Sequence, residues 1–157
     1  LEHLSFRLAT RTGTIPTWFG ELTKLELLDL DWNHFSGTIP TELGLLSNLK
    51  YLMLNRNFLT GTVPTAVSYL PALNILMLDT NSFENTILVG DDQSCEANRA
   101  GRINHLIADC GTLEETPQKE VDCPCCTSCC TDSSPRCNMV DWALTVEEEF
   151  RGSYDRY

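Results

Sequence analysis

The first half of the chain repeats one pattern of apolar and polar positions every 24 residues. Leu25, Leu49 and Leu73 occupy one position of this repeat. Other positions form columns in the same way: Leu4, Leu28, Leu52 and Leu76; Phe6, Leu30, Leu54 and Leu78; Asn33, Asn57 and Asn81; Gly13, Gly37 and Gly61; Pro16, Pro40 and Pro64. Self-similarity at a fixed period indicates a stack of identical structural units. The pattern predicts four coils over residues 1–88.

Each repeat predicts a short strand followed by a turn and an outer segment. Two apolar residues on either side of a single residue, such as Leu28 and Leu30, point the same way from a strand and fill the interior. A buried Asn carboxamide where the chain leaves the strand can satisfy backbone groups of adjacent coils. The Gly and Pro columns suit a bend and the start of a helical turn. The predicted fold is an α/β-type solenoid.

The segments Gly37-Thr38-Ile39-Pro40 and Gly61-Thr62-Val63-Pro64, after the Leu and Asn columns, resemble plant-type leucine-rich repeats. The resemblance covers residues 1–88 and implies a right-handed coil with a parallel β-sheet on the concave face. The outer face is then 3₁₀ or irregular. Proteins of this type include receptor-like proteins, receptor-kinase ectodomains and polygalacturonase-inhibitor proteins.

The repeat pattern degenerates at both ends. Ala9 stands where Asn is expected, and Asn85-Thr86-Ile87-Leu88 replaces the Gly-x-Ile-Pro segment. Each repeat of a solenoid contacts only its neighbours, so the last coil needs a cover. We expect residues 89–157 to form a small disulfide-rich capping region, which gives two parts: the array, 1–88, and the cap, 89–157.

The strand residues between the buried columns are expected to face outward on the concave side. One flanking column, Leu8, Trp32, Arg56 and Thr80, adds charge beside an apolar stripe. Aromatic, Met and Arg side chains are typical of binding surfaces. We therefore predict a partner-binding surface formed by Leu27, Asp29, Asp31, Trp32, Tyr51, Met53, Asn55, Arg56, Ile75, Met77 and Asp79.

Two other interpretations of this surface remain open. Apolar residues such as Leu27 and Ile75 can be tolerated strand formers. Alternatively, the C-terminal region folds over them.

All eight cysteines follow the repeats, at Cys95, Cys110, Cys123, Cys125, Cys126, Cys129, Cys130 and Cys137. An even number in a short segment favours a disulfide framework in an oxidising compartment. The spacing of Cys126 and Cys129 also suits zinc, but no second separated pair or nearby His completes a ligand set. A redox centre lacks its usual βαβ context. The run Cys123-Pro124-Cys125-Cys126-Thr127-Ser128-Cys129-Cys130 resembles the C-terminal segment of diatom-type leucine-rich-repeat receptor-like proteins.

The segment between Cys95 and Cys110 predicts a helix that lies over the fourth coil. Its apolar residues, Ala97, Ala100, Ile103, Leu106 and Ile107, have helical spacing, and Gly111 follows.

Charge narrows the range of partners. The chain has 11 basic and 22 acidic residues, a net charge of −11, with 6 basic and 14 acidic residues in 89–157. This charge repels phosphate-rich polymers, so nucleic acid is a poor partner. No apolar run is long enough to cross a bilayer, and no leader opens the segment, although an anchor or signal peptide upstream is compatible with the sequence.

The sequence therefore predicts an extracellular or cell-surface recognition module that binds a protein, peptide or glycan, together with a possible co-receptor. No catalytic constellation, cofactor motif or metal-binding His pair is recognisable, so we expect no enzyme activity, cofactor or metal. The alternatives are a secreted inhibitor of a polysaccharide-degrading enzyme, and a structural adhesion module or an intracellular zinc-binding scaffold.

Overall fold

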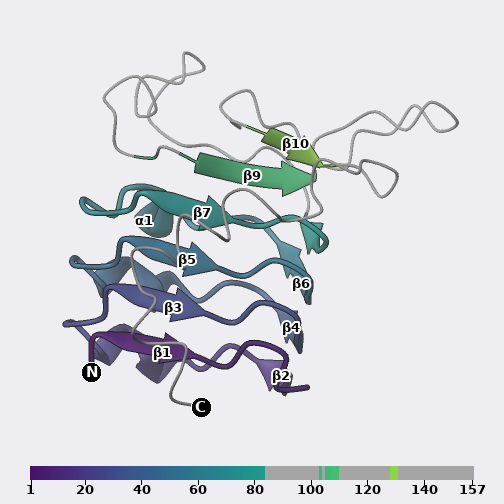
Figure 1. The fold of residues 1–157 in the computed structure, drawn as a ribbon, viewed down its shortest axis with the longest axis horizontal. Helices are drawn as coiled ribbons and strands as arrows, with labels where there is room; N and C mark the ends of the chain where they lie inside the picture. Colours follow the sequence, from purple (N-terminus) through teal and green to yellow (C-terminus); the bar gives the residue numbers. More distant parts are fainter. Residues whose placement is uncertain (84–102, 104, 110–127, 131–157) are drawn as a thin grey trace, which may run out of the picture.

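A computed structural model describes residues 1–83, 103, 105–109 and 128–130 of the chain. The four repeats form stacked coils, and each contributes one short strand to a sheet along one side of the stack (Figure 1). These strands are β1 (His3–Ser5), β3 (Leu27–Asp29), β5 (Tyr51–Met53) and β7 (Ile75–Met77). All neighbours are parallel, and Leu28 pairs with Leu4 and Leu52. The predicted parallel sheet and its register are confirmed.

A second sheet, which the sequence pattern did not predict, follows the turn of each coil. It contains β2 (Thr12–Thr14), β4 (His34–Gly37), β6 (Phe58–Gly61) and β8 (Ser82–Phe83), again all parallel. The sequence pattern did not indicate these strands because Gly13 lies within β2, and Gly37 and Gly61 are the last residues of β4 and β6. Their φ angles are 91°, 76° and 75°, and glycine is usually depleted in strands.

The outer face consists of three short helical turns. They are the 3₁₀ helices η1 (Thr17–Glu21) and η2 (Thr41–Leu45) and the one-turn helix α1 (Thr65–Ser68). Each begins directly after a proline in an extended conformation, with φ between −67° and −62°. The predicted 3₁₀ outer face and the role of the Pro column are therefore confirmed.

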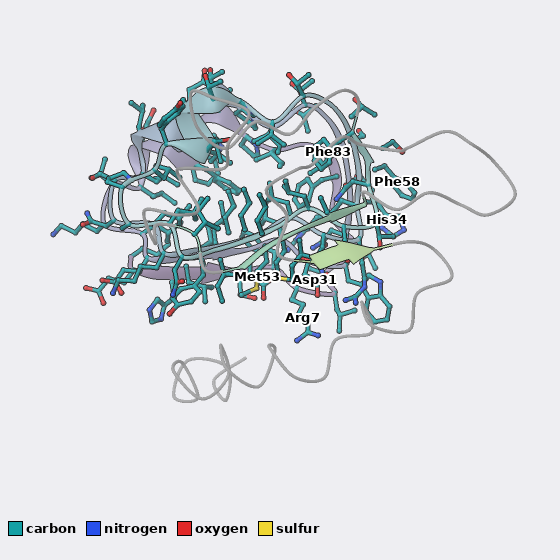
Figure 2. All side chains as sticks on the ribbon, turned by 90° about the horizontal axis from the view of Figure 1, so that it is seen from above. Arg7, Asp31, His34, Met53, Phe58 and Phe83 are labelled. Carbon is teal, nitrogen blue, oxygen red and sulfur yellow. The ribbon has the colours of Figure 1, made fainter. Side chains whose placement is uncertain are left out.

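The apolar columns form one continuous core. Leu25, Leu49 and Leu73 are fully buried, as are the two central strand columns of coils two to four. Figure 2, a view along the stack, shows the side chains that fill the space between the sheets and the outer turns. Burial of each large aliphatic side chain contributes about 1.5–3 kcal/mol, so the repeat pattern is primarily a packing pattern.

The predicted helix between Cys95 and Cys110 is wrong where the structure describes it. Residues His105–Asp109 form a strand, β9, which pairs in parallel with β7 and places Leu106 beside Leu76. Ile103, Leu106 and Ile107 are buried, as predicted. A further strand, β10 (Ser128–Cys130), pairs with β9. The cover of the fourth coil is thus a continuation of the concave sheet, while residues 95–102 lie outside the described residues.

Within the described ranges, we find no helix that is long and apolar enough to span a bilayer.

Candidate functional site

Most side chains of the predicted partner-binding surface are buried, which contradicts the expected exposure. The exposed fraction is 6% or less for nine of them: Leu27, Asp29, Asp31, Tyr51, Met53, Asn55, Ile75, Met77 and Asp79. Their alternation along the strands is as predicted, and Figure 2 shows Met53 and Asp31 pointing away from the core. The alternative in which residues 89–157 fold over this face concerns residues largely outside the described ranges. The partner-binding role of these side chains stays a prediction.

Asp31 lies at the centre of an ion-pair network at the carboxyl ends of the concave strands. Its carboxylate is 3.2 Å from Arg7 Nε and 3.4 Å from Arg56 Nη1. Burial raises the pKa of Asp31 above its ordinary value, while the charges of Arg56 and Arg7 oppose this shift. Removal of water from the carboxylate therefore outweighs the attraction of the two arginines.

Trp32 is the exposed member of the predicted surface, and the side chain of Arg56 beside it is 14% exposed. Trp32 is 53% exposed, and the guanidinium carbon of Arg56 lies 5.1 Å from the centre of its ring. This distance suits a cation–π contact. Both residues have a left-handed backbone, with φ of 55° and 53°. That conformation costs roughly 1–2 kcal/mol for an L-residue, so these positions retain large side chains where glycine or asparagine would be less strained.

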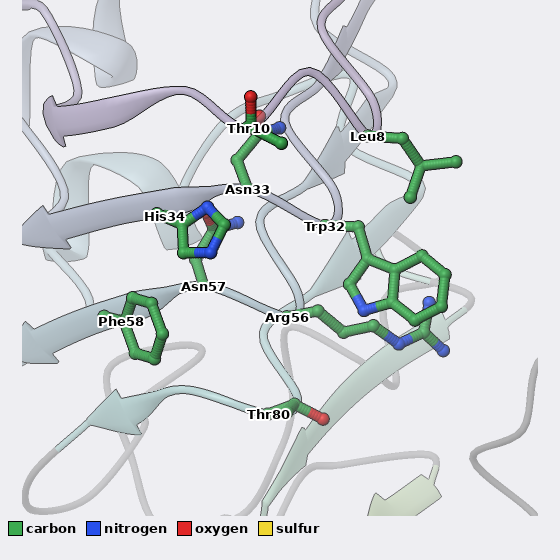
Figure 3. Close-up of a pocket in the computed structure, with 9 residues that line it drawn as sticks. All are labelled: Leu8, Thr10, Trp32, Asn33, His34, Arg56, Asn57, Phe58 and Thr80. Carbon is green, nitrogen blue, oxygen red and sulfur yellow. The ribbon is translucent and has the colours of Figure 1, made fainter.

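These two residues line a groove of about 400 Å³, which we call the aromatic groove (Figure 3). Phe58 and His34 form its other aromatic side, with ring centres 5.6 Å apart and planes inclined by 38°. Phe58 is 58% exposed. The complete lining is Leu8, Thr10, Trp32, Asn33, His34, Arg56, Asn57, Phe58 and Thr80.

His34, Phe58 and Thr10 line the groove but do not belong to the surface predicted from the sequence. All three lie one position after the Asn column or its equivalent, at a spacing of 24. The available signal was the presence of two aromatic rings at a repeat position that faces solvent.

The asparagine ladder is confirmed as a structural feature. Asn57 Nδ2 donates hydrogen bonds to the carbonyls of Leu30, Leu54 and Asn55, at 2.9–3.1 Å. Its Oδ1 accepts from the Phe35 backbone N–H at 3.0 Å. Asn33 and Asn81 make equivalent contacts. The ladder therefore joins adjacent coils, and its carboxamides are already occupied where they line the groove.

The second sheet presents a face of hydroxyl groups beyond the groove, which we call the hydroxyl face. Strand pairing places Thr14 beside Ser36 and Thr60 beside Ser82. Asp, Glu, Lys and Arg are absent from β2, β4, β6 and β8. The exposed hydroxyl residues are Thr12, Thr14, Ser36, Thr38, Thr60, Thr62 and Ser82.

The disulfide candidates stay predictions. Cys129 and Cys130 lie on β10, where the structure gives their backbone, and Cys95, Cys110, Cys123, Cys125, Cys126 and Cys137 lie outside the described residues. Within the described part of the chain, no cluster of three His, Cys, Asp or Glu side chains could hold a metal ion.

The family model that matches this chain is the Leucine Rich Repeat, at residues 24–46 and 48–70. Each range begins three residues before the concave strand of coil two or three and ends just after the outer turn of that coil. No curated protein sequence is significantly similar to the chain.

Several solved structures are similar to the array. The PEPR1–AtPEP1 structure is 42% identical, with a TM-score of 0.50, over 51% of this chain and 11% of that one. The Arabidopsis receptor kinase HAESA, solved with the peptide hormone IDA and the co-receptor SERK1, is 35% identical with a TM-score of 0.52, over 56% and 15%. A plant ice-binding protein is 28% identical with a TM-score of 0.56, over 69% and 33%.

The chain thus spans 11% of the PEPR1–AtPEP1 chain and 15% of the HAESA chain that it matches. The ranges matched by the family model contain strands β3 and β5 of the concave sheet and the outer turns η2 and α1. The described repeats thus form a leucine-rich-repeat solenoid, similar in fold to the matched parts of these solved structures.

Proposed function

We propose that this chain is part of an extracellular or cell-surface recognition protein whose repeats bind a peptide or protein through the aromatic groove. The observation that carries the proposal is the groove itself, with Trp32 and Phe58 each more than half exposed on either side of Arg56. Exposed Trp and Arg are the side chains most enriched at binding hot spots. Solenoids also present their ligand surfaces along one continuous side.

The similar structures support this proposal. HAESA was solved with a peptide hormone and a co-receptor, and this type of solenoid is therefore suited to both kinds of partner. Since most concave side chains are buried, we place the principal contact at the carboxyl ends of the concave strands, where Trp32 is exposed and Arg56 lines the groove.

The proposal can be tested with a panel of extracellular peptides and proteins, using surface plasmon resonance on the full 157-residue chain. Trp32→Ser and Phe58→Ser should each weaken binding of a ligand by roughly 30-fold or more, as expected of hot-spot residues. Trp18→Ser is the matched control, because Trp18 is 54% exposed but lies on the outer turn η1.

Equal affinity of all three variants for a bound ligand would exclude the groove as the contact. Binding of a polysaccharide-degrading enzyme in place of peptides would favour the inhibitor alternative.

Ice binding is a second candidate function, and the hydroxyl face favours it. Neighbouring strands lie about 4.8 Å apart, so the paired hydroxyl residues Thr14 and Ser36 lie side by side, as do Thr60 and Ser82. Phe58 pairs with Ser36 and interrupts the first of these rows. The lack of charged residues on these strands suits ordered water, and the similarity to a plant ice-binding protein supports this candidate.

The test is thermal hysteresis and inhibition of ice recrystallisation. Thr60→Tyr, in the middle of the hydroxyl face, should remove most of the activity, whereas Thr65→Tyr on the outer helix α1 should retain it. Absence of both effects in the unmodified protein would reject this candidate and leave the groove unaffected.

A further inference from the structure

The charge of the aromatic groove is one-sided. Among the described residues that line it, Arg56 carries the only permanent charge, and no carboxylate lines the groove. Its partner Asp31 is 3% exposed and does not belong to the lining. Because Asp31 is also paired with Arg7, two cations share one carboxylate. The guanidinium of Arg56 is therefore suited to accept a second, exposed carboxylate.

The aromatic rings occur in the two central coils. The repeat position after the Asn column holds Thr10, His34, Phe58 and Ser82 along the stack. His34 and Phe58 thus form one ring pair, and Trp32 stands at the other side of the groove (Figure 3). Trp32 and Phe58 are each more than half exposed in the same groove, so both rings offer surface to an aromatic side chain of a ligand.

The carboxamides of the groove are not available to the hydroxyl groups of a saccharide. Recognition of sugar hydroxyls needs several free, directed hydrogen-bonding side chains. The two carboxamides of the lining, Asn33 and Asn57, are already bonded to backbone groups. A polyanionic saccharide would also be repelled by the net charge of −11.

We propose that the aromatic groove binds a peptide segment in which an aromatic residue is adjacent to a single acidic residue. The aromatic side chain lies between Phe58 and Trp32, and the carboxylate pairs with Arg56. The inference rests on the proposed peptide or protein binding and names the chemistry that this groove selects.

The experiment measures fluorescence anisotropy of labelled Gly/Ser-rich peptides that differ at two central positions: Glu-Phe, Gln-Phe and Glu-Ala. Glu-Phe should bind at least about tenfold more tightly than either of the others, because a charge-assisted hydrogen bond or a buried ring is lost in each. Arg56→Gln should remove the preference for Glu-Phe over Gln-Phe, and Phe58→Ser should remove the preference over Glu-Ala. Trp18→Ser should leave all affinities unchanged.

Thermal unfolding of each variant shows whether the fold is retained, and Arg56→Lys provides a charge-conserving variant. Lys should preserve part of the preference for Glu, since it keeps the positive charge without the planar fork of the guanidinium.

Two results would overturn the inference and leave the proposed function standing. One is peptide binding without preference for the acidic or the aromatic residue. The other is displacement of the labelled peptides by a neutral oligosaccharide such as cellohexaose, with the displacement lost in Arg56→Gln and Phe58→Ser. Failure of every peptide and protein to bind would instead remove the proposed function together with the inference.

Discussion

Each asparagine of the ladder satisfies backbone groups in two neighbouring coils with one side chain. Asn57 is 6% exposed and makes four hydrogen bonds to backbone groups. No other side chain of similar size offers two donors and an acceptor in this geometry. The Asn column is therefore required by the fold and carries no information about a ligand.

Asn57→Ala should destabilise the protein by about 3 kcal/mol, because it leaves buried carbonyls and an N–H without partners. The measurement is equilibrium unfolding in urea. Asn48→Ala is the control, since exposed Asn48 also bonds to the preceding coil, through the Thr23 carbonyl at 2.8 Å. Its cost should stay below about 1 kcal/mol. Similar losses at both positions would contradict the assigned role of the ladder.

The ion-pair network of Asp31 with Arg7 and Arg56 makes the stability of the fold depend on pH. Because burial raises its pKa above 3.8, the folded protein binds a proton at Asp31 more readily than the unfolded chain does. Its contribution to stability is therefore fully present below pH 3.8 and is lost as the pH rises through the folded pKa.

This sign can be measured by comparing the unfolding free energies of the unmodified protein and Asp31→Asn across acidic to neutral pH. The stability of the unmodified protein relative to the variant should decline as the pH rises through the folded pKa and then remain level. A relative stability that increases with pH would mean that Arg7 and Arg56 outweigh burial. The other carboxyl groups cancel in this comparison.

The outer turns pack closely because glycine stands where they meet. A Cβ on Gly44 would lie 2.5 Å from Ala66 Cβ in the next turn, and one on Gly20 would collide with the backbone of Glu42. This contact brings η1, η2 and α1 together along the outer face. The 24-residue column Gly20, Gly44 and Ser68 carries this signal, which the sequence analysis overlooked.

Gly44→Ala should cost about 1–3 kcal/mol in unfolding free energy, as expected of overpacking. The double substitution Gly44→Ala with Ala66→Gly should recover part of this loss, because the colliding methyl group is removed. Gly13→Ala is a useful comparison, since Gly13 has φ of 91° and open space at its Cβ position. If Ala66→Gly gave no recovery, the contact between the turns would not limit stability.

Strand β9 illustrates how an element can be misassigned from its apolar spacing. Ile103, Leu106 and Ile107 fit one face of a helix, but a strand buried on both faces also gives a near-continuous apolar run. The deciding factor is the exposed edge of β7, whose unpaired N–H and C=O groups a new strand can satisfy. Because that edge belongs to residues 75–77, the sequence of residues 95–110 alone does not indicate that a strand forms there.

At the scale of the whole molecule, the oxidation state of the cysteines indicates the compartment in which the protein folds. We expect all eight cysteines to be oxidised in protein from an oxidising host, with no bound zinc, as a disulfide-capped extracellular module requires. Thiol labelling under denaturing conditions, with mass and metal analysis of the same sample, measures both properties. Stoichiometric zinc with reactive thiols would instead support the intracellular scaffold.

The amino-acid sequence by itself determined the coil number, the parallel concave sheet, the proline-initiated outer turns and the asparagine ladder, because each depends on contacts repeated at one spacing. It also predicted that Trp32 and Arg56 belong to one surface, and both line the aromatic groove. Only the tertiary structure decided which concave side chains are accessible, that a second sheet follows each turn, and that β9 extends the first sheet. These features depend on contacts between segments that no local pattern records.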